Sequence, residues 1–114
     1  MASTLTDNSD DENFRGLRET LSVLGDKWTL QVVHAVNSGD VRFEQIQSRL
    51  SIARNILARR LETLVSTGVL VKVPYNDRPV RHEYRLTPRG LLLQEVNDSL
   101  IEWSKKWGSP VAGD

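Results

Sequence analysis

The chain has 114 residues, which is enough for one domain of ordinary size built around one hydrophobic core. Its 39% apolar and 26% charged residues are typical of a globular protein, and its formal net charge is zero. Because cysteine is absent, this chain has no disulfide scaffold, no cysteine-ligated metal and no thiol chemistry. No apolar run approaches the roughly 20 residues of a membrane helix, and the polar, acidic N-terminus does not resemble a signal peptide.

The N-terminal part of the sequence changes character at Asn13. Residues 1–12 are small, polar and acidic, so we expect a disordered acidic tail there. From Asn13 onward, the apolar residues are spaced by three and four positions, as on one face of a helix. They are Phe14, Leu17, Leu21 and Leu24. This spacing predicts a first helix over residues 13–24, with Asn13 as its cap and Gly25 as its end.

Three further helices are predicted in the middle of the chain. Residues 27–37 are apolar on most sides and follow Asp26, so they predict a capped, buried central helix. Residues 42–49 form a short helix whose apolar residues include Phe43 and Ile46. After a turn at residues 51–52, a longer amphipathic helix is expected over residues 53–67, ending at Gly68.

The C-terminal half begins with a hairpin. Residues 69–73 and 80–86 have the β-branched and alternating patterns of strands, and residues 74–79 between them have the composition of a turn. Thr87 and Pro88 then start a last helix that runs to about Trp107. The predicted fold is mainly α with a small β-hairpin, as one domain over residues 13–108 followed by a flexible C-terminus at 109–114.

A short helix, a tight turn and a longer helix form a helix-turn-helix, and a hairpin directly after it forms a wing. Residues 41–90 hold ten basic and four acidic residues, and nine of the ten basic residues are arginine. Arginine presents a planar fork of donors that suits phosphates and guanine edges. The sequence therefore predicts double-stranded DNA as the partner, with a solvated basic face as the ordinary alternative.

The residues expected to contact DNA fall into two groups. The exposed face near the start of the longer helix is expected to read bases, and it consists of Arg54, Asn55, Ala58 and Arg59. Arginines on the preceding helix and in the wing are placed to contact phosphates, and they are Arg49, Arg78 and Arg81. Arg60 lies near the core edge of the same helix, so it is expected to form a local ion pair or a phosphate contact.

Four short motifs occur in this order: Gly-x-Lys-Trp at residues 25–28, Arg-Phe-x-x-Ile at 42–46, Leu-x-x-Arg-Leu at 57–61 and Tyr-x-Leu-Thr at 84–87. Together they resemble the HxlR-type bacterial transcriptional regulators, a winged-helix group near the MarR type, over residues 14–107. The resemblance implies a cytoplasmic homodimer that joins through its first and last helices and occupies operator DNA, usually an inverted repeat.

The sequence departs from that family in two places. Family members often carry a cysteine near the first helix, whereas this chain has Phe14 and Leu17 there, which excludes a thiol switch. The recognition helix usually starts with serine after isoleucine, whereas here Ala53 follows Ile52 and cannot cap. Either Ser51 caps instead, or the helix begins at a neighbouring position, which shifts the base-reading register by about one residue.

The first and last helices carry more apolar surface than a chain of this length can bury, so we expect a homodimer interface there. Its expected residues are Phe14, Leu17, Leu21, Leu100, Trp103 and Trp107. Trp28, Trp103 and Trp107 are expected in the core and the interface, and the alternative is a pocket for a small apolar or aromatic effector.

His34 and His82 are expected to be structural, and neither a metal, a cofactor nor an enzymatic activity is predicted. The alternative to a DNA-binding regulator is a winged-helix module for protein–protein contact, which does not require the basic face.

Overall fold

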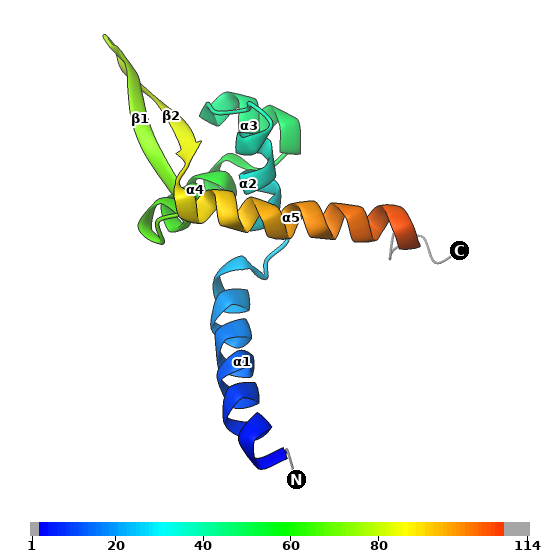
Figure 1. Ribbon diagram of the computed structural model, residues 1–114. Coiled ribbons are helices and arrows are strands. Elements are labelled where there is room, and N and C mark those ends of the chain that lie inside the picture. The colour runs from blue at the N-terminus through cyan, green and yellow to red at the C-terminus, as the bar shows by residue number, and fades with distance from the viewer. Residues whose placement is uncertain (1–2, 109–114) are drawn as a thin grey trace.

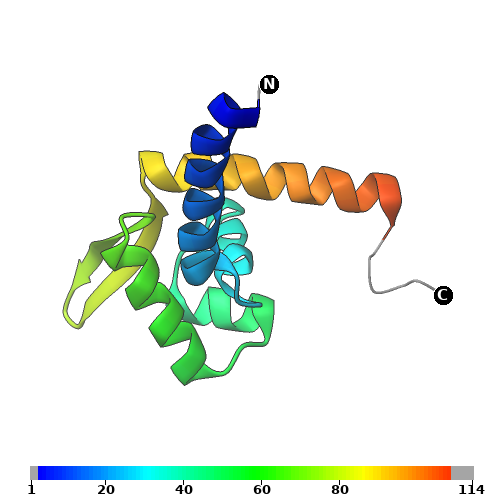
Figure 2. The ribbon, with the colours of Figure 1, turned by 90° about the horizontal axis from the view of Figure 1, so that it is seen from below.

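The computed structural model describes residues 3–108, and the side chains of residues 9–108. Five helices and one antiparallel hairpin follow one another in the described part of the chain, as predicted. Their bounds are α1 Ser3–Leu24, α2 Thr29–Asn37, α3 Phe43–Leu50, α4 Arg54–Ser66, β1 Leu70–Asp77, β2 Val80–Leu86 and α5 Pro88–Trp107. Helices α2, α3 and α4 form a compact group, the wing extends from one side, and α1 and α5 project away from it (Figures 1 and 2).

The first helix is longer than its apolar spacing predicted. It begins at Ser3 and not at Asn13, so the predicted start is wrong by ten residues. The predicted domain bounds stay predictions, and the C-terminal segment at 109–114 lies outside the described residues. Helix α1 makes little contact with the other elements and stands apart from them in Figure 1.

The core lies around α2, as its apolar composition predicted. Val32 and Val33 are fully buried, and they pack with Ile46 of α3 and with Leu57 and Leu64 of α4. His34, on the same helix, is exposed and not a core residue, because it lines a cavity described below. The buried face of α2 therefore fixes the positions of the two helices that follow it.

Asp26 holds the start of α2, as the sequence predicted, although the helix begins at Thr29. Its Oδ1 accepts hydrogen bonds from the backbone N–H groups of Trp28 at 2.8 Å and Thr29 at 2.9 Å. The Thr29 hydroxyl donates to Oδ2, and Arg60 Nε donates to Oδ1 at 3.0 Å. Burial alone would raise the pKa of Asp26, but these hydrogen bonds together hold the pKa below its usual value.

We expect Asp26→Asn to lower the free energy of unfolding by about 1 kcal/mol at pH 7, because the substitution removes the charge from a capping group. The depressed pKa means that the ionised form stabilises the fold above the unfolded-state pKa and that this contribution is lost as the pH falls below about 4. Urea unfolding of both proteins from pH 3 to pH 7 tests this. The difference between them should shrink on acidification, whereas Asp77→Asn on the exposed wing should leave stability unchanged at pH 7.

The wing is longer and its turn tighter than the sequence predicted. The predicted turn at 74–79 is wrong, because β1 continues to Asp77 and only Arg78 and Pro79 connect it to β2. Leu70 pairs with Leu86, and the pairing runs to Asp77 opposite Val80. The register shifts between Pro74 and Asn76, so Tyr75 forms a bulge. Proline is compatible with this position because a two-stranded sheet consists only of edge strands.

The start of α5 agrees with the prediction from Thr87 and Pro88. The Thr87 side chain accepts a hydrogen bond from the backbone N–H of Gly90 at 3.1 Å, and its own hydroxyl donates to the carbonyl oxygen of Gly68, just before β1. Gly90 is buried against the carbonyl oxygen of Val69 and the side chain of Leu86, which leaves no room for a Cβ atom. The first turn of α5 is therefore held in one position against the base of the wing.

We expect Gly90→Ala to destabilise the protein by about 1–3 kcal/mol, because the new methyl group would overlap the Val69 carbonyl oxygen. Gly16→Ala is the matched control, since a Cβ at Gly16 meets nothing within 4 Å and alanine is the better helix former. Chemical denaturation of both variants should give shifts of opposite sign. Equal effects would contradict the tight packing of Gly90.

Two exposed apolar stripes remain on the surface. On α1, Phe14, Leu17 and Leu21 are each more than half exposed. The stripe on α5 follows helical spacing and consists of Leu92, Val96, Leu100, Trp103 and Trp107. In the described part of the chain, no helix is both long enough and apolar enough to cross a membrane.

Candidate nucleic-acid interface

The turn between α3 and α4 defines how the two helices meet. Ser51 has a left-handed backbone conformation, with φ of 53°, and ends α3. The alternative that Ser51 caps α4 is therefore wrong. Ala53 occupies the N-cap position without a side-chain hydrogen bond, and α4 begins at Arg54, one residue later than predicted. Buried Ile52 anchors the turn in the core, so the start of α4 is held by packing.

The outer face of α4 carries the four residues expected to read bases. Arg54, Asn55, Ala58 and Arg59 are all exposed on this helix. The Arg54 guanidinium lies over the ring of Phe43, 4.8 Å from its centroid, so α3 restrains this side chain. Within the described residues, neither Arg54 nor Arg59 has a carboxylate at ion-pair distance. Their donors are therefore available to an external acceptor.

Two other arginines of the helix-turn-helix are paired. Arg60 forms an ion pair with Asp26 at 3.0 Å, which confirms the local ion pair that its position at the core edge predicted. Arg49 donates from Nε to Asp40 Oδ2 at 2.8 Å, but its side chain remains 64% exposed. The terminal nitrogens of Arg49 are thus still accessible for the phosphate contact that the sequence predicts.

The wing is tied to the start of α3 by contacts that the sequence analysis missed. The backbone N–H of Tyr84 donates to the carbonyl oxygen of Val41 at 2.7 Å. Arg42 lies over the ring of Tyr75, 4.2 Å from its centroid, and its Nε is 3.4 Å from Glu83 Oε2. These pairs join residues more than thirty positions apart, so no local pattern could reveal them.

The wing carries Arg78 at its turn and Arg81 on β2, and both are exposed. Neither has a carboxylate partner within the described part of the chain. Where α4 faces the wing, a hollow of about 440 Å³ is lined by Arg59, Glu62, Lys72 and Tyr84. Burial, with a smaller contribution from the charge of Glu62, raises the pKa of Tyr84, so its hydroxyl stays neutral at physiological pH.

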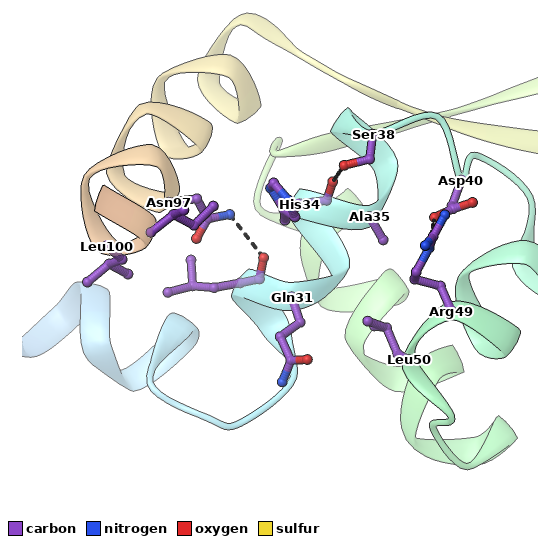
Figure 3. A pocket seen from close by; sticks show the side chains of 11 residues that line it. Gln31, His34, Ala35, Ser38, Asp40, Arg49, Leu50, Asn97 and Leu100 are labelled. Atoms are coloured by element: carbon purple, nitrogen blue, oxygen red, sulfur yellow. Dashed lines mark hydrogen bonds and ion pairs between the residues drawn. The ribbon is translucent and has the colours of Figure 1, made fainter. Parts of the chain in front are cut away.

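A larger cavity of about 490 Å³ lies where α2, α3 and α5 meet, away from α4 and the wing (Figure 3). Its lining includes Leu30 and His34 of α2, Leu50 of α3, and Asn97 and Leu100 of α5. None of the three tryptophans lines it: Trp28 precedes α2, while Trp103 and Trp107 lie near the end of α5. Among the described residues, no three histidine or acidic side chains gather closely enough to hold a metal ion.

This arrangement of α3, turn, α4 and hairpin is a winged helix-turn-helix. The family model for the HxlR-like helix-turn-helix matches residues 23–112, and the chain belongs to that family. The resemblance stated from the four sequence motifs is thereby confirmed.

Relatives support the same assignment. The uncharacterized HTH-type transcriptional regulator Rv3095 of Mycobacterium tuberculosis is 38% identical over 87 residues, covering 76% of this chain and 55% of that protein. The chain thus spans about half the length of this relative. An uncharacterized HTH-type transcriptional regulator of Methanothermobacter thermautotrophicus is 34% identical over 104 residues, covering 90% of this chain and 79% of that protein.

Among solved structures, the reduced form of the transcriptional regulator YodB from Bacillus subtilis superposes with a TM-score of 0.70. It is 28% identical and covers 87% of this chain and 96% of YodB. YodB treated with diamide superposes with a TM-score of 0.66 at 28% identity, covering 82% of this chain and 93% of YodB. The similarity over almost all of YodB supports the winged-helix fold over 87% of this chain.

Proposed function

We propose that this chain is a transcriptional regulator, and not an enzyme, that binds operator DNA in the cytoplasm as a homodimer. Helix α4 enters the major groove, and the wing contacts the flanking backbone. The observation that carries this proposal is the outer face of α4, where Arg54, Asn55 and Arg59 are exposed and the two arginines have no carboxylate partner in the described residues. Arginine can bind guanine, and asparagine adenine, through two hydrogen bonds.

The homodimer is supported by the apolar stripes of α1 and α5. A monomer that exposes Phe14, Leu17, Trp103 and Trp107 together presents more apolar surface than scattered exposed residues would. A two-fold pair that covers both stripes would place two α4 helices on one side, about 34–36 Å apart for half-sites one helical turn apart.

The absence of cysteine indicates how binding can be controlled. This chain has none, so neither oxidation nor a disulfide at a thiol can release it from DNA. We propose instead that a small apolar or aromatic effector controls binding near the dimer interface. Its contact residues would be Trp28, Trp103 and Trp107.

Selection of bound duplexes from a random pool tests the proposed function. We expect an inverted repeat whose half-sites are about 10 base pairs apart, and weaker binding of all duplexes as salt rises from 50 to 200 mM. If no sequence is enriched and no duplex binds even at low salt, the chain is instead a protein–protein interaction module.

We expect Arg78→Ala and Arg81→Ala to weaken binding to every duplex alike, because phosphate contacts carry no sequence information. Each lost phosphate contact should reduce the slope of log K against log salt by about 0.9. Arg49→Ala should also weaken binding to every duplex, because it removes the terminal nitrogens that contact a phosphate. Titration of operator and unrelated DNA at several salt concentrations checks both effects, and a variant that changes sequence preference would contradict the assigned role.

A further inference from the structure

The cavity between α2, α3 and α5 has the size and the walls of a small-molecule site. Its volume of about 490 Å³ falls within the range of typical ligand pockets. Most of the surface of its walls is apolar, and the aliphatic lining residues include Leu30, Leu50, Leu100 and Ile101. Such walls favour a compact apolar body and leave selectivity to the few polar groups that reach the cavity.

Two polar residues that line the cavity, His34 and Asn97, are hydrogen-bonded to buried Gln94 of α5. Gln94 Nε2 is 3.0 Å from both Asp98 Oδ1 and His34 Nδ1, and its Oε1 accepts from Asn97 Nδ2 at 3.2 Å. Since both hydrogens of Nε2 are donated, His34 Nδ1 is the acceptor and the proton of the ring is on Nε2. His34, which lines the cavity, therefore has an N–H donor on Nε2 with no acceptor within the described residues.

Asn97 supplies the matching acceptor. Its Nδ2 donates to the carbonyl oxygen of Leu30 at 3.0 Å and to Gln94, so both amide hydrogens are engaged. Its Oδ1 accepts no hydrogen bond within the described residues, yet no buried side-chain oxygen there lacks a partner. The oxygen must therefore remain open to solvent, and Asn97, although 95% buried, is one of the residues that line the cavity.

The charges of the residues that line the cavity cancel. Asp40 and Arg49 both line it, and they form an ion pair with each other at 2.8 Å. His34 is neutral when its Nδ1 accepts from Gln94. With no net charge to offset desolvation of an ion, the cavity favours an uncharged ligand over a carboxylate or an amine.

We propose that this cavity binds a small neutral molecule with an apolar body and one hydroxyl group, such as a phenol. In the proposed complex the ligand oxygen accepts from His34 Nε2, and its O–H donates to Asn97 Oδ1. Figure 3 labels both residues. Ligand binding itself does not depend on the proposed function, whereas its effect on DNA affinity rests on that function. The ligand contacts both α5, which carries the proposed dimer interface, and α3 of the helix-turn-helix. It therefore alters DNA affinity if its own affinity differs between dimers with different distances between their two α4 helices.

Binding is tested on the full-length chain by amide chemical shifts during titration with phenol, benzene or benzoate. We expect phenol to shift residues 30–38 and 97–101, benzene to bind about two- to tenfold more weakly because it lacks the hydroxyl, and benzoate to be weakest. His34→Phe should weaken phenol about two- to tenfold and leave benzene unchanged. His82→Phe, on β2 and outside the lining, is the matched control and should leave phenol affinity unchanged.

Phenol shifts that map elsewhere, equal affinities for phenol and benzene, or unchanged phenol affinity in His34→Phe would each overturn this site. A lack of phenol binding, as expected if a second copy of the chain fills the cavity, would overturn it as well. The two proposals fail separately: DNA binding without phenol binding refutes only the ligand site. Phenol binding by a chain that binds no duplex refutes only the DNA-binding function.

Discussion

Alanine at Arg59 is expected to reduce discrimination between the operator and unrelated DNA by about 1–3 kcal/mol, which is roughly 5- to 150-fold. The exposed guanidinium has no carboxylate partner in the described residues, so its donors can form two hydrogen bonds to a guanine. Arg54→Ala and Asn55→Ala should lose discrimination in the same way if each contacts a base. Competition binding with single-base variants of the selected operator measures the loss at each position.

Arg54→Lys separates the shape of the side chain from its charge. Lysine keeps the positive charge but loses the planar fork and the stacking over Phe43, so we expect specificity to fall almost as far as in Arg54→Ala. Arg81→Ala on the wing is the control, since it removes one charge without touching α4. If the wing variants change the preferred sequence and the α4 variants do not, the roles of the two elements are reversed.

Glutamate at Leu17 or at Trp103 is expected to separate the proposed dimer into monomers. Both side chains are about half exposed in the single chain, so the substitutions cost little in the monomer but place a charge in an apolar interface. Light scattering should change from about 26 kDa, twice the chain mass of 12.9 kDa, toward one chain mass. Operator affinity should fall by about 10²- to 10⁴-fold, because the second half-site is no longer held nearby.

Val80→Glu is the matched control for these two variants. Val80 is an exposed apolar residue on the wing, 63% exposed and remote from both stripes, so its substitution should leave the mass unchanged. Circular dichroism should show that the helices of the variants remain folded outside α1. A wild-type mass of one chain at micromolar concentration would contradict the dimer directly.

Local patterns in the sequence predicted most of the fold because each depends on neighbouring residues. Asp26 and Thr87 are capping groups with donors two or three residues away, and the apolar face of α4 follows from Leu57, Leu61 and Leu64. The start of α1 was missed because residues 3–12 contain almost no apolar spacing. The length of the wing was missed because Pro74 and Asn76 are typical of turns, although a two-stranded edge accommodates them.

The candidate site was predictable only in part, for the same reason. The outer face of α4 follows from helical spacing alone, but pairing across the fold does not. Nothing near Arg49 in the sequence indicates that Asp40 engages it, and nothing near Arg42 points to Tyr75. The exposure of His34 and the cavity beside it depend on how α5 packs across α2, which a single helix pattern cannot specify.

Because α1 makes little contact with the rest of its own chain, the folding of this helix depends on the concentration of the protein. A lone helix of this kind is marginally stable in water, so its folding depends on what covers its apolar stripe. If a second copy covers it, the stability of the helix rises with the concentration of the protein itself. Sparse molecules would expose a segment open to proteases, whereas abundant ones would protect one another. Such a regulator would have a threshold of expression below which it is cleared and above which it persists.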